Sequence, residues 1–186
     1  MQFSLRIVPT LALVWALFLA LPALNAHAQS ALSAPLSATA TIQQWIARDA
    51  PQEAMKVIEQ RLRQNPNDPN LRFQKAYVLE LLGQTDLAIA QYEALTEMHP
   101  EFSEPQNNLG VLMAAKQELE QAQARFELAL RANPHNQMAR ENLADVMIRL
   151  AQRQYQAVQK AQPNNPRIQA KQEALVPVLQ LLKAQP

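Results

Sequence analysis

Residues 107–134 read NNLGVLMAAKQELEQAQARFELALRANP, a run of helix-forming residues that ends on a proline. Ala122, Phe126 and Pro134 in this stretch each belong to a series of similar residues that stand 34 apart. The four series with this spacing are Ala54, Ala88 and Ala122; Ile58, Tyr92 and Phe126; Pro66, Pro100 and Pro134; and Trp45, Leu79, Met113 and Met147. Four series at one spacing indicate a repeated structural unit.

The residue types in these series suit a pair of packed helices. An alanine lets two helices approach closely, and the larger side chain that follows it fills the space between neighbouring units. The proline ends the second helix, because it lacks a backbone donor and disfavours helix in the residue before it. The only two glycines of the chain, Gly83 and Gly110, fall at a turn and at a helix crossing of this plan.

A unit of this length and pattern resembles the tetratricopeptide repeat (TPR), a helix-turn-helix unit. The third unit, about residues 103–136, matches best, although Gln117 stands where the family has a turn glycine. The second unit, 69–102, also matches. The first unit, about 37–68, matches the repeat poorly at its start, as is common for terminal repeats. The resemblance implies an all-α fold, a short right-handed solenoid, whose repeat-packing residues are Trp45, Ala54, Ala88, Tyr92, Gly110, Ala122, Phe126 and Ala129.

The fourth unit departs from the pattern, because its second-helix signature arrives early. Ala151 stands five residues ahead of the expected position, and no turn residue separates Met147 from Tyr155. The apolar positions from Leu143 to Val158 fit one stripe at helical spacing. We therefore predict a single long helix over about 137–162 in place of a hairpin.

A last helix is expected over about 167–183. Its end, from Leu175 to Leu182, is apolar nearly all round, and Pro177 is expected to kink or split it. We interpret this helix as a cap that covers the last repeat, which repeat arrays need. The alternative is an exposed apolar surface for a partner or a second copy of the chain.

The N-terminus has the features of a secretory signal peptide over residues 1–28. An apolar run follows Arg6, and Ala26 and Ala28 form a small-residue cleavage site after it. Cleavage after Ala28 would leave the protein periplasmic or otherwise exported, whereas an uncleaved segment would serve as a membrane anchor. The remaining plan is a flexible lead-in over 29–37, a repeat array of about three full repeats and a fused fourth over 38–163, and the capping helix over 164–186.

In the family that this chain resembles, the first helices of successive repeats line a concave groove. By alignment to the repeat, the groove residues here are Asn70, Phe73, Gln74, Tyr77, Glu80 and Leu81; Glu104, Asn107, Asn108, Val111 and Ala115; and Met138, Glu141, Asn142, Asp145 and Arg149. Gln74, Asn108 and Asn142 form a further column at the spacing of the repeat. Similar family members use an asparagine here to bond the backbone of a peptide, because an amide both donates and accepts. The alternative is that these amides stabilise a helix start or the neighbouring repeat.

The charges of the groove predict the chemistry of its partner. Arg149 is the one cation among the predicted groove residues, and the acidic ones are Glu80, Glu104, Glu141 and Asp145. A carboxylate ligand would be repelled by this set, so we expect a neutral or basic peptide or helix segment of another protein.

Composition excludes several classes of function. The chain has no cysteine, which excludes disulfides and thiolate metal sites. Its histidines stand at no metal-ligand spacing and no glycine-rich phosphate loop occurs, so we expect neither a metal, a cofactor nor catalysis. No basic stretch interleaved with aromatics supports nucleic-acid binding. We expect a non-catalytic adaptor or assembly factor for an envelope protein; the alternative is a self-assembling or membrane-tethered scaffold that uses the C-terminal helix.

Overall fold

The structure is a computed structural model that describes residues 37–184, with side chains through Leu182. The predicted signal peptide and the lead-in as far as residue 36 lie outside the described residues. Residues 37–184 form eight helices and no strand: α2 (Ala38–Ala47), α3 (Pro51–Gln64), α4 (Pro69–Leu81), α5 (Thr85–Met98), α6 (Ser103–Ala115), α7 (Leu119–Ala132), α8 (Gln137–Ala161) and α9 (Pro166–Ala184). None of these helices combines the length and apolarity needed to cross a bilayer.

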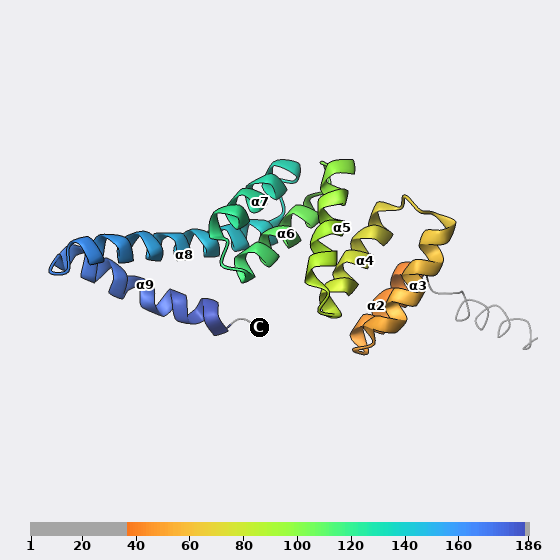
Figure 1. Cartoon of the computed structure of the whole chain (residues 1–186), viewed down its shortest axis with the longest axis horizontal. Coiled ribbons are helices and arrows are strands. Elements are labelled where there is room, and N and C mark those ends of the chain that lie inside the picture. The colour runs from red at the N-terminus through yellow and green to blue at the C-terminus, as the bar shows by residue number, and fades with distance from the viewer. Residues whose placement is uncertain (1–36, 185–186) are drawn as a thin grey trace, which may run out of the picture. The chain divides into compact units, whose positions relative to one another are not determined.

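The helices are packed in the order of the chain. Each helix contacts the next one, and α6 also contacts α8 (Figure 1). The first six described helices therefore make three helix-turn-helix pairs, and the long α8 and the final α9 follow them. This confirms the all-α repeat solenoid predicted from the sequence.

The core consists of separate clusters strung along the array. One cluster joins α2, α3 and α4, a second joins α4, α5 and α6, and a third joins α6, α7 and α8. Ala88 and Tyr92 of the second cluster are both 0% exposed, and so is Ala122 of the third. Each repeat is therefore stabilised mainly by its immediate neighbours, as expected of a quasi-one-dimensional fold.

The turns inside the three helix pairs share one backbone conformation. Asp49, Gly83 and Gln117 have φ angles of 54°, 72° and 64°, in the left-handed region, and they too follow one another at the spacing of the repeat. Glycine adopts this region without strain, whereas Asp and Gln hold it at a cost. The turn that the sequence located at Gly83 is thus a backbone feature of each pair, including the two pairs that lack the glycine.

The fourth position in this column is Ala151, and it lies inside α8. Alanine is the strongest helix former and has no tendency toward the left-handed region, so the helix runs through the point where the other repeats turn. Asn136 caps its start, since the side chain accepts a hydrogen bond of 3.0 Å from the backbone N of Ala139. The observed helix, Gln137–Ala161, confirms the single long helix predicted over about 137–162.

The last helix also exists, and of the two effects expected of Pro177, a kink or a split, the split does not occur. Helix α9 continues through this residue from Pro166 to Ala184. A proline removes one backbone donor and leaves the carbonyl four residues earlier, that of Glu173, without its partner. Both Pro177 and Glu173 are exposed, so water can satisfy the freed carbonyl and the helix survives.

Candidate binding groove

The predicted groove residues lie on α4, α6 and α8, the first helices of successive repeats, and the structure sorts them by exposure. The exposed ones are Asn70, Tyr77, Leu81, Glu104, Val111, Ala115, Met138 and Glu141. The half-buried ones are Phe73, Glu80, Asn108, Asn142, Asp145 and Arg149. Gln74 and Asn107 are only 8% and 3% exposed, so these two are packing residues and present little surface to a ligand.

Five of the predicted residues meet in one pocket between α6 and α8. Its volume is about 240 Å³, and its walls include Val111, Ala115, Asn142, Asp145 and Arg149. Phe126, the third member of the series that begins at Ile58, lines it from α7. The structure therefore gives the C-terminal half of the predicted groove a defined cavity with an apolar floor and a charged rim.

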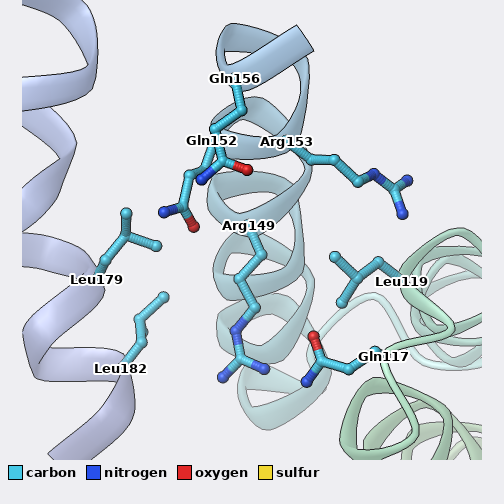
Figure 2. A pocket seen from close by; sticks show the side chains of 8 residues that line it. All are labelled: Gln117, Leu119, Arg149, Gln152, Arg153, Gln156, Leu179 and Leu182. Atoms are coloured by element: carbon cyan, nitrogen blue, oxygen red, sulfur yellow. The ribbon is translucent and has the colours of Figure 1, made fainter. Parts of the chain in front are cut away.

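A second pocket, of about 330 Å³, continues from the first, because Arg149 and Leu182 line both. Figure 2 shows the side chains that surround it: Gln117, Leu119, Arg149, Gln152, Arg153, Gln156, Leu179 and Leu182. Three of these positions extend the predicted set along α8, and two come from α9. Sequence reasoning missed the α9 leucines because it treated that helix as a cap with no part in the groove.

The N-terminal half of the predicted groove is less enclosed. Asn70 lines a different pocket, beside His99 and Phe102 at the α5–α6 turn. Phe73 packs on Tyr92 and Phe102, with ring centroids 5.7 and 5.4 Å apart, so it belongs to the core between the second and third repeats. Met138 is 67% exposed and Tyr77 37%, and both are available to a partner.

The asparagine column is engaged in a hydrogen-bond chain that crosses three repeats. Asn142 Nδ2 donates to Asn107 Oδ1 at 3.0 Å, and Asn107 Nδ2 donates to Asn108 Oδ1 at 3.3 Å. Asn108 Nδ2 then donates to Tyr92 Oη at 2.8 Å, and Tyr92 Oη donates to Glu80 Oε1 at 2.5 Å. These amides therefore join neighbouring repeats, which was the alternative interpretation of the column. Only their remaining donor and acceptor positions are available to a ligand.

Burial raises the pKa values of two residues in this hydrogen-bond chain, Tyr92 and Glu80. Desolvation raises the pKa of Tyr92, and its hydrogen bond to Glu80 raises it further. Desolvation also raises the pKa of the Glu80 carboxyl, although the hydrogen bond from Tyr92 opposes that shift. Tyr92 and Glu80 form a structural link between α4, α5 and α6, and neither of them lines the pockets around Arg149.

The rim of the groove is acidic around the guanidinium of Arg149. Burial and the neighbouring Glu141 raise the pKa of Asp145, whereas Arg149 lowers it. Arg153 adds a second cation that the sequence-based list did not contain, but it is paired with Glu120. Within residues 37–184, no group of three or more His, Asp or Glu side chains is placed to hold a metal ion.

Solved structures of other proteins have a fold similar to that of this chain. No family model and no curated protein sequence matches the chain. The first TPR domain of Spaghetti (RPAP3), solved with the HSP90 peptide SRMEEVD, matches with a TM-score of 0.55 and 19% identity, over 61% of this chain and 90% of that one. The Sgt2 TPR domain from Aspergillus fumigatus matches with a TM-score of 0.57 and 18% identity, over 63% and 79%.

Two further solved structures match part of the chain. The Yersinia enterocolitica type III secretion chaperone SycD, in complex with a peptide of the translocator YopD, matches with a TM-score of 0.53 and 16% identity, over 60% of this chain and 91% of that one. The TPR protein YrrB is 27% identical with a TM-score of 0.49, and the match covers 54% of this chain and about half, 52%, of YrrB. With its repeat period and helix order, the chain has the fold of the tetratricopeptide-repeat proteins.

Proposed function

We propose that this chain is a non-catalytic interaction module that binds a segment of another protein along α4, α6 and α8. The observation that carries the proposal is the pocket between α6 and α8, which five of the predicted groove residues line; a second pocket adjoins it at Arg149 and Leu182. Two solved proteins of the same fold hold peptides, one from HSP90 and one from YopD. The likeness to them is in the fold, so the partner of this chain has to be argued from its own side chains.

The side chains favour a neutral or basic segment with apolar anchors. Val111 on the pocket wall is 42% exposed, and Tyr77 and Met138 on the same helices are exposed as well. Glu104, Glu141 and Asp145 place negative charge beside these apolar residues, and Arg149 alone among the predicted groove residues opposes it. Apolar anchors supply affinity and complementary charge selects the partner and speeds association.

We also propose that the partner is an envelope protein. This rests on the signal-peptide pattern of residues 1–28, which implies export, with an adaptor or assembly factor as the role. An intact mass that begins at Gln29 supports a cleaved, exported protein. A mass that includes Arg6 supports a membrane-tethered scaffold instead.

A self-assembling scaffold is the second candidate, because α9 also presents apolar side chains to solvent. Leu181 is 67% exposed, Val176 47% and Val178 36%. If these residues form a homotypic interface, the oligomeric state depends on concentration and Leu181→Asp returns the protein to a monomer. If the protein is monomeric throughout, this candidate is eliminated.

Capture of partners from an envelope fraction tests the proposal. The tagged protein is compared with Val111→Lys, which places a positive charge on the pocket wall, and with Leu87→Lys on α5. Val111 is 42% exposed and Leu87 57%, and Leu87 lies outside the groove, so both variants are expected to keep the helical content of the wild type. A partner that the Leu87→Lys variant retains and the Val111→Lys variant loses supports groove binding. A partner retained by both variants places the binding surface elsewhere.

A further inference from the structure

Helix α9 lies across the C-terminal end of the groove. It contacts α8 and places Leu179 and Leu182, each 9% exposed, in the pocket that Arg149 lines. Figure 2 shows both leucines projecting from α9 toward the face of α8 that carries Arg149 and Gln152. Leu182 also lines the neighbouring pocket with Val111 and Asn142 of the predicted groove. Part of the candidate ligand site is therefore covered by the protein's own last helix.

The contact between α9 and α8 leaves open hollows that are lined largely by polar side chains. Besides the 330 Å³ pocket, a space of about 440 Å³ lies between the two helices, and its walls are mostly glutamines, including Gln152, Gln156 and Gln172. The three buried hydrophobic clusters of residues 37–184 include no residue of α9. A contact that lies outside these clusters and is lined largely by polar side chains resembles a displaceable interface more than a core.

The sequence of α9 has the chemistry that the groove selects. Ile168, Leu175, Leu179 and Leu182 recur at intervals of seven, four and three residues, which places them on one side of a helix. Arg167, Lys171 and Lys183 against Glu173 give α9 a formal charge of +2. The charged residues that line the two pockets beside α9 are Asp145, Arg149 and Arg153, so these pockets carry no excess of negative charge. The preference for a basic helix rests on Lys171, whose ammonium lies 5.2 Å from the ring centroid of Tyr155 on α8.

We propose that the C-terminal end of the groove is built for a basic amphipathic helix with leucines three and four residues apart, and that α9 occupies this place until a partner helix of the same kind displaces it. This inference rests on the proposed function and specifies the ligand of the groove. The ligand is a helix that lies in the groove, and the alternative is a peptide in extended conformation. A tethered ligand has an effective concentration in the millimolar range, so the intramolecular helix masks the site from weak competitors.

A labelled synthetic peptide of residues 166–184 tests the proposal by fluorescence anisotropy. It is titrated with the full chain, with the double variant Leu179→Asp/Leu182→Asp, and with Leu181→Asp as the matched control. The double variant loses the two leucines that enter the pocket, whereas Leu181 is 67% exposed. We expect the double variant to bind the peptide at least ~10-fold more tightly than the wild type, because its own helix no longer competes. The control is expected to bind like the wild type.

Equal binding by all three proteins, or binding by none, would overturn the proposal. Adding Val111→Lys, which places a like charge against the basic peptide, to the double variant is expected to abolish binding of the peptide; if it does not, the peptide binds elsewhere and the proposal fails. Hydrogen exchange of the wild type provides a readout that no variant can disturb by misfolding. Amides of 166–184 are expected to exchange at least ~100-fold faster than those of α7, and equal protection would make α9 a fixed cap.

These outcomes are separate from those of the partner capture. If the double variant binds the α9 peptide but the protein captures no envelope protein, the helix-in-groove site is supported and the adaptor role is rejected. If the protein captures a partner but its groove never binds the α9 peptide, the adaptor role is supported and the helix-in-groove site is rejected. Concentration-dependent dimers that disappear in the double variant would identify a second copy as the occupant and overturn the proposal of a partner helix.

Discussion

A Cβ atom added to Gly110 would lie 2.5 Å from Cε1 of Phe126, so the phenyl ring packs directly on the backbone of α6. Phe126 comes from the paired helix α7 and is 1% exposed. The closest approach of the two helices in the third repeat is therefore set by a missing side chain on one and an aromatic ring on the other. The same ring forms the closed side of the groove pocket, which ties repeat packing to the candidate site.

Gly110→Ala is expected to destabilise the protein by about 1–3 kcal/mol, the usual cost of forcing a methyl group into a packed core. The affected atoms belong to a buried ring that cannot rotate away without moving its neighbours. Chemical denaturation followed by circular dichroism measures the change. Gly83→Ala is the comparison, since nothing lies within 4 Å of a Cβ at that position and only the left-handed backbone resists it. If Gly83→Ala lowered the free energy of unfolding and Gly110→Ala did not, the α6–α7 contact would be looser than described.

Gln117→Gly is expected to stabilise the protein by up to about 1.5 kcal/mol, since a left-handed residue other than glycine costs ~1–2 kcal/mol and the extra unfolded-state entropy of glycine offsets ~0.5–1 kcal/mol of this gain. Ala151→Gly is the matched change at the equivalent position of α8, one repeat later. It is expected to destabilise by about 1 kcal/mol, because glycine weakens a helix interior. Opposite shifts of the urea midpoint in the two variants would support the turn column. Shifts of the same sign would contradict it.

Ala88→Leu and Ala122→Leu are each expected to cost about 1–3 kcal/mol by overpacking the contact between paired helices. Both alanines are 0% exposed. Ala90→Leu and Ala124→Leu are the controls, because these alanines are exposed on the same two helices. Thermal melts of the four variants test the register of the repeat. If the Ala88 and Ala122 variants melted like their controls, the register assigned to the repeat would be wrong.

The repeat period predicted the backbone well, because helix limits, turns and alanine contacts follow from residue size and proline chemistry at each position. It predicted the side-chain partners of the groove less well. Asn107 and Asn108 are adjacent in sequence, and a step of one residue turns a helix by about 100°, which is enough to bury the first and leave the second half-exposed. A register uncertain by one residue cannot separate them.

The position of α9 could not be predicted from the sequence at all. Leu179 and Leu182 have the same residue type and spacing whether they cap the last repeat, meet a second copy or enter the groove. The length of α8 decides between these three possibilities. Helix α8 extends beyond the three helix pairs, and α9 then packs back along α8. That geometry depends on Ala151 and on the loop after Ala161, and it appears only once both helices are in place.

Tyr92→Phe is expected to destabilise the protein by about 1–3 kcal/mol, although the aromatic ring is kept. The hydroxyl donates to Glu80 and accepts from Asn108, so its removal leaves a half-buried carboxylate and a half-buried amide without a partner. Denaturation midpoints measure the loss. A double-mutant cycle with Asn108→Ala separates the part that passes through the amide. A near-zero coupling energy would show that the hydrogen-bond chain between repeats adds nothing to stability.

Glu80→Gln tests the same link through pH. Burial raises the pKa of Glu80 above its ordinary value of 4.5, so the folded protein holds this proton more tightly than the unfolded chain does. The contribution of this carboxyl to stability is therefore fully present below pH 4.5 and is lost as the pH rises through the folded pKa. Glutamine keeps an oxygen that can accept from Tyr92 and never becomes charged.

At pH 7 the Glu80→Gln variant is expected to melt at or above the temperature of the wild type, because it avoids burying a charge. The advantage should shrink as the pH falls toward 4.5, where the wild-type carboxyl takes up its proton in both states. Thermal melts of both proteins between pH 4 and 8 measure this difference, with Glu104→Gln as a control at an exposed groove carboxylate. If the variant were less stable than the wild type at pH 7 and the gap closed on acidification, the charged form of Glu80 would be the stabilising one. Its hydrogen bond from Tyr92 would then outweigh the cost of burial.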